Sequence, residues 1–318
     1  VHAVTNLSFD IAEGETLGIV GESGCGKSTT ARAVIQLPKP TSGVVEFEQK
    51  DLTNLKGESL RNIRPDIQMI FQDPISSLNP RRSVFNIVSE GVNIWNETND
   101  DSSEDRVIEI IKDVGLDVQE ALVKRPHEYS GGQCQRISIA RALVLDPKII
   151  ICDEPVSALD VSVQARILNM LEDMKERYGL TLLFISHDLS VVKNVSDRVA
   201  VMYLGKLCEI GDGDLLYEEP AHPYTRLLLA AIPDPNNKHS GNQDILEGEL
   251  PSPINPPSGC RFRTRCPRAT EKCTVEEPEF QQIGNSDHWV ACHFPHIDGD
   301  NKQDEIIWPP QEAIEGSE

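Results

Sequence analysis

The chain has 318 residues, enough for one large domain or two smaller ones that bury a core of their own. Its 51 Asp and Glu residues outnumber its 30 Lys and Arg residues, and the formal net charge of −21 argues against a protein that binds nucleic acid. An acidic surface is compatible with ordinary solubility, but few lysines against many carboxylates favour a salt-rich cytoplasm, as in a halophilic archaeon.

The apolar runs and the scattered cysteines indicate the compartment. The longest apolar runs, 180–185 and 227–232, are far shorter than the ~18 residues that a membrane helix needs, and no signal peptide opens the chain. Four cysteines lie far apart along the sequence, namely Cys25, Cys134, Cys152 and Cys208. Such free, dispersed thiols are typical of a reducing cytoplasm.

Strand and helix patterns alternate through the first two thirds of the chain. Short apolar runs predict strands at 17–20, 44–47, 67–71, 148–152 and 180–185. Helical spacing of apolar residues predicts a helix from Val163 to Tyr178, and another helix begins at Lys27 after a glycine-rich turn. This alternation predicts an α/β fold with a parallel sheet and crossover helices.

Two stretches depart from this alternation. Residues from about 75 to 142 are mostly helical in pattern and predict a helical subdomain inserted between two strands. After residue 212 prolines become frequent and periodicity fades. We therefore expect a core domain at 1–212, a loop-rich, cysteine-containing extension at 213–299 and a disordered acidic tail at 300–318.

A glycine-rich loop at residues 21–28 matches the phosphate-binding pattern G-x-x-x-x-G-K-[ST]. Its glycines let backbone N–H groups face a phosphate, Lys27 places a positive charge on the β and γ oxygens, and Ser28 offers a hydroxyl to Mg²⁺. The helix that follows points its positive dipole end at the same anion. The predicted ATP-binding residues here are Gly21, Glu22, Ser23, Gly24, Cys25, Gly26, Lys27, Ser28 and Thr29.

Further polar residues follow the other predicted strands. Asp153 and Glu154 end the strand at 148–152, where a carboxylate can hold Mg²⁺ and its neighbour can orient an attacking water. The segment Ser130, Gly131, Gly132 and Gln133 precedes a helix over 135–144, which predicts a second anion site at a helix N-terminus. Three more polar residues complete this set of candidate site residues. Gln72 and His187 lie at strand ends, and Asp160 is the last residue of the segment 157–160.

Together these motifs resemble, in kind and order, the nucleotide-binding domain of ABC ATPases over residues 1–212. The resemblance implies a P-loop NTPase fold, ATP and Mg²⁺ as ligands, and Mg²⁺ held by Ser28, Gln72 and Asp153. It further implies that Glu154 is the catalytic carboxylate, that His187 contacts the γ-phosphate and that Gln72 couples the site to a membrane partner. Ser130 to Gln133 and Asp160 would serve ATP bound by an opposite subunit. The family's aromatic platform for adenine is expected upstream of Val1.

Later segments resemble the subgroup of ABC ATPases that power oligopeptide, dipeptide and nickel importers. The segments at 221–226 and 250–260, with Cys266-Pro267 and Cys292, look like the extension of that subgroup, and 155–161 looks like its second, F-type ATPase. The resemblance implies peptide import at the cytoplasmic face of the cell membrane, with a homologous second ATPase, two permease subunits and an extracellular solute-binding protein as partners, and no nucleic acid.

Other substrates and other classes of ABC protein are alternatives. Sugars or nickel are alternative substrates for an importer of this type, and an exporter subunit is possible in principle. A soluble ABC protein acting on ribosomes or nucleic acid is expected to carry two nucleotide domains or a long coiled-coil insertion. A regulatory module with a dead site would lack Lys27 or Glu154, and both are present.

Four cysteines crowd the extension with the spacing C-x5-C-x6-C-x18-C: Cys260, Cys266, Cys273 and Cys292. Unrelated thiols, disulfides and a zinc site are alternatives, but a reducing cytoplasm disfavours disulfides and structural zinc sites favour closer cysteine pairs. Four thiolates at wider spacing suit a [4Fe–4S] cluster, which some members of the resembling family carry in this extension. We therefore expect an iron–sulfur cluster that fastens a loop-rich segment.

Overall fold

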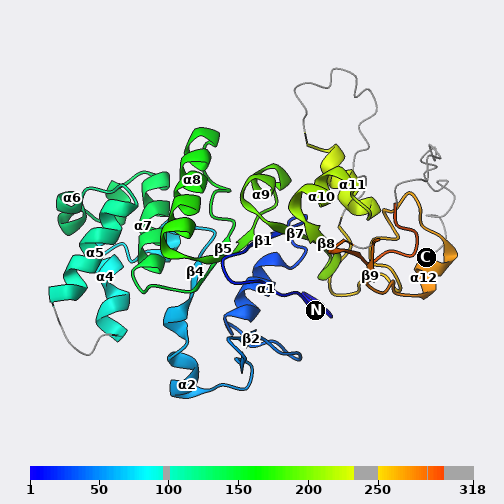
Figure 1. Cartoon of the computed structure of the whole chain (residues 1–318), viewed down its shortest axis with the longest axis horizontal. Coiled ribbons are helices and arrows are strands. Elements are labelled where there is room, and N and C mark those ends of the chain that lie inside the picture. Colours follow the sequence, from blue (N-terminus) through cyan, green and yellow to red (C-terminus); the bar gives the residue numbers. More distant parts are fainter. Residues whose placement is uncertain (96–100, 233–249, 285, 297–318) are drawn as a thin grey trace. The chain divides into compact units, whose positions relative to one another are not determined.

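The structure of this chain is a computed structural model that describes residues 1–95, 101–232, 250–284 and 286–296 (Figure 1). The chain divides into two compact units, each built from separate parts of the sequence. The central unit comprises Asp10–Gly18 and Ser28–Ser186, and the terminal unit comprises Val1–Phe9, Ile19–Lys27 and the residues from His187 onward. No helix among the described residues is long and apolar enough to cross a membrane.

The central unit is organised by parallel strands. β4 (Ile67–Ile70) pairs with β5 (Ile149–Asp153), and β5 pairs with β6 (Thr181–Ile185), both in parallel. Nearly all of β5 and β6 is buried, as expected for strands that are covered on both faces and written as continuous apolar runs. These strands confirm the predictions at 67–71, 148–152 and 180–185.

Several further elements complete the central unit. β1 (Thr16–Val20) contributes its first residues here and its last two to the terminal unit. The predicted strand at 44–47 is only two residues long, β2 (Glu46–Phe47), paired with β3 (Lys50–Asp51). The helices are α1 (Lys27–Val34), which begins in the terminal unit, α2 (Gly57–Arg61) and α8 (Val161–Tyr178), with the short 3₁₀ turn η1 (Arg64–Asp66).

The residues between β4 and β5 are mostly helical, as the sequence predicted. They form α3 (Pro74–Ser77), α4 (Val84–Trp95), α5 (Asp101–Asp113), α6 (Val118–Val123), η2 (Pro126–Glu128) and α7 (Gly131–Leu143). Their shared core contains Ile87, Ile110 and Ile137, each at most 1% exposed. The boundaries of the predicted subdomain stay a prediction, and part of its polar stretch, 96–100, lies outside the described residues.

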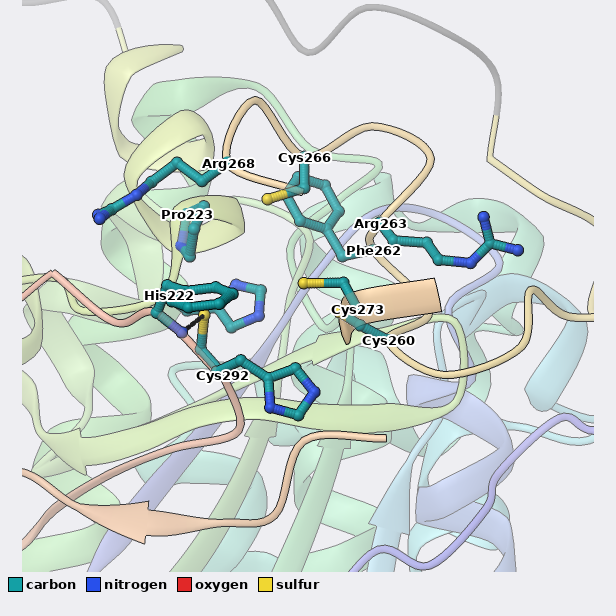
Figure 2. A pocket seen from close by; sticks show the side chains of 11 residues that line it. His222, Pro223, Cys260, Phe262, Arg263, Cys266, Arg268, Cys273 and Cys292 are labelled. Atoms are coloured by element: carbon teal, nitrogen blue, oxygen red, sulfur yellow. Dashed lines mark hydrogen bonds between the residues drawn. The ribbon is translucent and has the colours of Figure 1, made fainter. Parts of the chain in front are cut away.

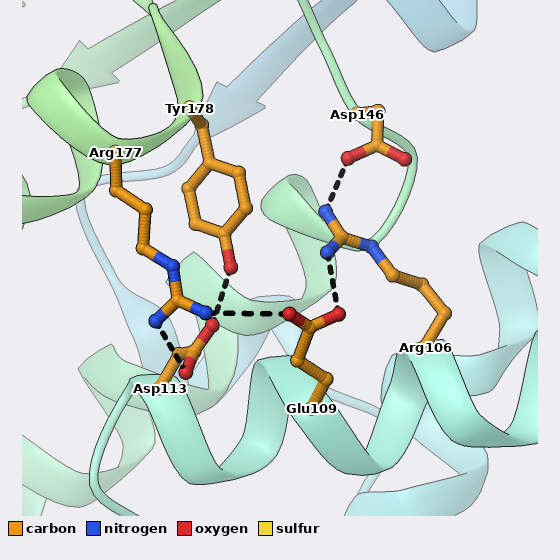
Figure 3. A network of polar contacts seen from close by, with 6 residues as sticks. All are labelled: Arg106, Glu109, Asp113, Asp146, Arg177 and Tyr178. Carbon is orange, nitrogen blue, oxygen red and sulfur yellow. Dashed lines mark hydrogen bonds and ion pairs between the residues drawn. The ribbon is translucent and has the colours of Figure 1, made fainter.

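A polar network ties α5 to the end of α8 (Figure 3). Arg177 binds Glu109 at 3.3 Å and Asp113 at 2.7 Å, while Glu109 also accepts from Arg106 at 3.0 Å. Asp146, before β5, and Tyr178 complete the network by bonds to Arg106 and Asp113. Because most of these groups are half exposed, each pair adds little alone, but sharing one side chain among several partners lowers the entropy cost of the set.

The terminal unit contains an antiparallel pair, in addition to the parallel strands of the central unit that the sequence predicted. β7 (Arg198–Tyr203) pairs with β8 (Lys206–Asp212), and the two residues between them, Leu204 and Gly205, both have positive φ, at 43° and 79°. A two-residue turn of this kind joins only antiparallel strands, since a parallel connection needs a long crossover. The helices of this unit are α9 (Leu189–Val195), α10 (Gly213–Glu218), α11 (Pro223–Ala230) and α12 (Glu271–Val275).

The extension contributes short strands to the same unit. β10 (His288–Val290) pairs antiparallel with β8, and β9 (Gln281–Gln282) pairs with β10. The edge of β8 is thereby covered by sequence that lies about 80 residues later, which satisfies backbone groups that an open edge leaves unpaired. The acidic tail at 300–318 and residues 233–249 lie outside the described residues.

A buried carboxylate holds this arrangement together. Glu209 of β8 is fully buried and accepts hydrogen bonds from the backbone N–H groups of Ala221, at 2.7 Å, and His222, at 2.9 Å. Its Oε1 also lies 2.7 Å from Nε2 of His288, which is 2% exposed. One side chain thus links β8, the entry to α11 and β10.

Replacing Glu209 by Ala should lower the free energy of unfolding by about 3–5 kcal/mol, because it leaves two buried N–H groups and a buried imidazole without a partner. The matched control is Glu277→Ala, which removes an ion pair with Lys206 from a half-exposed carboxylate and should cost under about 1 kcal/mol. Urea unfolding of both variants gives the comparison. Equal losses would show that Glu209 does not have the fastening role.

Candidate nucleotide and cysteine sites

The phosphate loop joins β1 to α1 and is shaped by close backbone packing. Gly21, Gly24 and Gly26 all have positive φ, at 153°, 82° and 108°. A Cβ on Gly21 would lie 2.1 Å from the carbonyl oxygen of Met202, and one on Gly26 would lie 2.3 Å from that of Ala3. Since a backbone carbonyl cannot move aside as a flexible side chain can, these positions require glycine.

The loop lysine is held over its own loop. Lys27 is 5% exposed, and its Nζ donates to the carbonyl oxygens of Gly21, at 2.7 Å, and Glu22, at 3.0 Å. The ammonium group is therefore already desolvated and positioned within the concave loop. An incoming phosphate can replace the two neutral carbonyl groups as the partner of this ammonium group. The exchange favours the phosphate, because a charged acceptor binds an ammonium group more strongly than a neutral one does.

Within the central unit, two hydrogen bonds join the carboxylates of Asp153 and Glu154 to Ser28 and Gln72. Ser28 Oγ donates to Oδ1 of Asp153 at 2.7 Å, and Asp153 is 1% exposed. Gln72 Nε2 donates to Oε2 of Glu154 at 3.0 Å. Because β4 and β5 are parallel neighbours, their carboxyl ends bring Gln72, Asp153 and Glu154 to one edge, and Ser28 of α1 joins them through its bond to Asp153. This edge supplies the oxygen ligands that Mg²⁺ prefers.

Glu154 has an unusual backbone. Its φ is +47°, in the left-handed region that non-glycine residues rarely occupy. The conformation is fixed by the hydrogen bond from its N–H group to the carbonyl oxygen of Ile185, at 2.9 Å. Strained backbone of this kind concentrates at functional positions, where the surrounding structure holds a side chain in a required direction.

The segment Ser130–Gln133 forms the start of α7, and the helix begins four residues earlier than predicted. Ser130 and Gln133 make a reciprocal capping box, with bonds of 3.3 Å and 2.9 Å between each side chain and the other's N–H group. A Cβ on Gly132 would lie 2.6 Å from a methyl of Val163, so glycine lets α7 approach α8 closely. Both capping side chains are exposed, so this helix end is open to an external anion.

The remaining predicted residues fall as follows. Thr29 and Asp160 are exposed residues of the central unit, and Asp160 is the N-cap of α8. His187 is an exposed residue two positions after the end of β6, and it opens the last part of the terminal unit. The phosphate loop through Lys27 belongs to the terminal unit, and Ser28 begins a segment of the central unit.

The four cysteines of the extension line one small pocket in the terminal unit (Figure 2). Cys260, Cys266, Cys273 and Cys292 are all free thiols and share the pocket with His222 and Phe262. The Cys260 N–H group donates to the Cys273 carbonyl oxygen at 2.8 Å, which holds these two segments together. Cys260 and Cys266 lie in one turn-rich stretch, Cys273 lies in α12 and Cys292 follows β10, so their gathering is a product of tertiary structure.

Burial raises the pKa of three of the four thiols. Removal from water raises the pKa of Cys266 to about 12 and that of Cys292 to about 11, and it also raises the pKa of Cys260. Among the described residues, no group of three or more His, Cys, Asp or Glu side chains is arranged to hold a single metal ion. The prediction of a metal centre is therefore not established by this geometry.

Comparison with known proteins identifies the family. Residues 4–157 match the family model described as "ABC transporter", and residues 208–273 match "Oligopeptide/dipeptide transporter, C-terminal region". The chain is 53% identical to the oligopeptide transport ATP-binding protein OppF of Salmonella typhimurium, over 92% of this chain and 87% of that protein. It belongs to the ABC transporter family.

Relatives in other bacteria are similar to the same extent. The oligopeptide transport ATP-binding protein AppF of Bacillus subtilis is 52% identical over 92% of this chain and 90% of that protein. The OppF protein of Escherichia coli is 52% identical over 92% of this chain and 87% of its own length.

Solved structures share the fold of this ABC protein. That of cbiO1 from Clostridium perfringens, part of the ABC transporter complex cbiONQ, is 31% identical, with a TM-score of 0.62 over 68% of this chain and 84% of that one. A dimeric ATP-binding cassette in a post-hydrolysis state with ADP and Pi has a TM-score of 0.60 and 31% identity, over 66% of this chain and 90% of that one. The predicted P-loop NTPase fold is thereby confirmed, and the chain is an ABC-type ATPase.

Two residues of this ABC protein that sequence reasoning missed lie against the phosphate loop. Tyr224 and Arg265, both in the extension, contact Glu22. Tyr224 belongs to a segment that the sequence linked only to the subgroup, and Arg265 follows no pattern that indicates a partner. Their partner lies more than 200 residues away, so no local signal could have identified it.

Proposed function

We propose that this chain hydrolyses ATP to drive the import of peptides through a membrane permease, as the F-type ATPase of an oligopeptide or dipeptide transporter. The observation that carries the proposal is 53% identity across 92% of the chain to an oligopeptide transport ATP-binding protein, together with the matched C-terminal region. Sugars or nickel are alternative substrates, since the permease and the solute-binding protein select the cargo.

The ATP chemistry follows from the residues described above. Lys27 and the loop amides of Gly21–Gly26 hold the β- and γ-phosphates, and His187 contacts the γ-phosphate. Ser28, Gln72 and Asp153 hold Mg²⁺, which neutralises the charge on the phosphate oxygens. Glu154 orients and polarises the attacking water, and the contact of Gln72 with Glu154 at 3.0 Å supports a role for Gln72 in positioning that carboxylate.

The residues at the start of α7 act on a second nucleotide. Ser130, Gly131, Gly132 and Gln133, with Asp160, face ATP held by an opposite ATPase subunit, so two subunits placed head to tail complete two sites. The exposed, capped start of α7 supports this arrangement of two subunits. An anion site at an exposed helix end is open to a nucleotide that another subunit holds. The partner in this proposal is a homologous second ATPase, giving a heterodimer.

The whole assembly lies at the cytoplasmic face of the cell membrane. The heterodimer docks on two permease subunits and acts, through them, with an extracellular solute-binding protein, and the chain itself is peripheral. No nucleic acid takes part, in keeping with the net charge of −21.

The cysteine pocket completes the proposal. Cys260, Cys266, Cys273 and Cys292 hold a [4Fe–4S] cluster that fastens the extension, and the donor set fits, since four thiols line one pocket. Among the described residues no group of three or more His, Cys, Asp or Glu is arranged around a single ion, so what supports a cluster over zinc is the wide sequence spacing of the cysteines. When bound, the cluster supplies a structural crosslink.

Replacing Glu154 by Gln should leave ATP binding nearly intact and lower turnover by about 10²–10⁴-fold, because it removes the group that polarises water. The assembled transporter is assayed for phosphate release, with Glu176→Gln, an exposed glutamate of α8, as the matched control. Normal hydrolysis by a transporter in which Glu154 and the equivalent carboxylate of the partner ATPase are both replaced would contradict the assignment.

Anaerobically purified protein should contain about four iron atoms per chain with broad visible absorbance. Cys266→Ser should lose this iron, whereas Cys134→Ser, a buried thiol of α7, should retain it. Metal analysis and absorbance give the readout. Stoichiometric zinc without iron would rule out the cluster, and the absence of any metal would rule out the site.

A halophilic origin makes a prediction about salt. The melting temperature should rise with KCl to about 2 M, because the Debye length falls from roughly 30 Å at 0.01 M to about 3 Å at 1 M and screens the self-repulsion of the net charge. Thermal unfolding followed by circular dichroism across the KCl series tests this. A melting temperature that stays constant from low to high salt would count against such an origin.

A further inference from the structure

Glu22 of the phosphate loop is held at three points. Its carbonyl oxygen accepts from Nζ of Lys27 at 3.0 Å, its N–H group donates to the hydroxyl of Tyr224 at 3.0 Å, and its carboxylate pairs with Arg265. The first partner is the lysine of the nucleotide site, and the other two come from the extension. All four residues belong to the terminal unit.

The pair between Arg265 and Glu22 is a bidentate one. Nη1 and Nη2 of the guanidinium donate to the two carboxylate oxygens at 2.6 Å and 3.0 Å. The arginine side chain is 5% exposed and the glutamate side chain 26% exposed, so solvent screens this pair less than the surface pairs of the chain. The guanidinium also lies over the ring of Tyr203, at 5.9 Å from its centre, which fixes its orientation.

The arginine is attached to the cysteine pocket. Arg265 directly precedes Cys266, and Arg261 directly follows Cys260. Arg261 is also buried, donating to the carbonyl oxygen of Leu204 and to Oγ1 of Thr5, and the next residue, Gly205, donates to the carbonyl oxygen of Cys25 in the phosphate loop at 2.7 Å. The loop between the first two cysteines therefore contacts the phosphate loop along two routes.

We propose that Arg265, supported by Tyr224, is a positioning residue that holds the phosphate loop at Glu22 and so couples the four-cysteine segment to nucleotide affinity. The inference rests on the proposed function of the loop in binding ATP. Fixing Glu22 fixes the carbonyl that Lys27 binds and the backbone around it, so the loop keeps the shape that a phosphate requires. Displacement of the cysteine segment withdraws the guanidinium and loosens the loop.

The coupling runs in both directions, because linkage between two sites is reciprocal. A nucleotide that requires the ordered loop stabilises the cysteine segment, and an intact cysteine segment raises nucleotide affinity. The chemistry at the four thiols thereby gives the extension a regulatory influence on ATP binding in addition to its structural one.

The test is equilibrium binding of a nonhydrolysable ATP analogue with Mg²⁺ to the full chain. Arg265→Gln should weaken binding by about tenfold, within the usual range for coupled sites, and Arg265→Lys should retain part of the affinity because it keeps the charge but loses the fork. Lys272→Gln is the matched control, a cation of the same segment in an exposed pair at 3.8 Å, and should bind as the unaltered chain does.

Three further readouts separate positioning from general damage. The double variant Glu22→Gln with Arg265→Gln should bind no more weakly than the single Arg265 variant, because both changes remove one interaction. In the assembled transporter the KM for ATP should rise with little change in kcat. Hydrogen exchange should quicken at the amides of residues 21–26 in the Arg265 variant. If Arg265→Gln fails to fold, Tyr224→Phe, which removes a single oxygen, should also quicken exchange at these amides.

The outcomes are distinct. If the unaltered chain binds no nucleotide, the proposed function fails. If it binds and the Arg265 and Tyr224 variants bind equally well, with unchanged exchange in the loop, the positioning role is overturned. Additive losses in the double variant would overturn the pairwise route through Glu22.

Discussion

Parallel pairing of β4 with β5 is the constraint on which the catalytic arrangement depends. In register, Ile70 lies opposite Cys152, so Gln72 and the pair Asp153 and Glu154 leave the sheet at the same edge. All but the first residue of β5 is buried, which keeps this strand in the interior of the unit. The contact of Gln72 with Glu154 is a consequence of this register, and Ser28 joins the same edge through its bond to Asp153.

The extension is part of the terminal unit rather than an attachment to it. Rings of Tyr203, Tyr224 and Phe262 pack against each other with centres 4.8–5.2 Å apart, and all three are at most 1% exposed. Tyr203 comes from β7, whereas the other two come from the extension, so the aromatic cluster joins the two parts by apolar burial. Glu209 adds a polar link at the same place, and the cysteine pocket is built beside this cluster.

Charge is distributed in keeping with these roles. Among the described residues the buried carboxylates are Asp153 and Glu209, while several cations are buried inside the terminal unit. Lys27, Arg261 and Arg265 are each at most 9% exposed and bind carbonyl or carboxylate oxygens. A buried cation is tolerated only where such partners are fixed, and these three hold or surround the phosphate loop.

The sequence by itself determined the elements whose chemistry is local. The phosphate loop, Ser130 at a helix start and the acidic pair after β5 are each specified by neighbouring residues, because tight turns, caps and strand ends depend on the chain within a few positions. The α/β class followed from the alternation of apolar runs with helical spacing. The order of these motifs was enough to indicate the family.

Tertiary structure decided the rest. The bond of Glu209 with His288 and the pair of Arg265 with Glu22 join residues separated by 79 and 243 positions, and β10 pairs with β8 from about 80 residues away. No periodicity encodes such pairing, because a strand's pattern states which face is buried but not which neighbour it meets. Sequence spacing placed four cysteines in one segment, but only the packing of a turn-rich stretch, α12 and the residues after β10 around Phe262 brought their thiols to a single pocket.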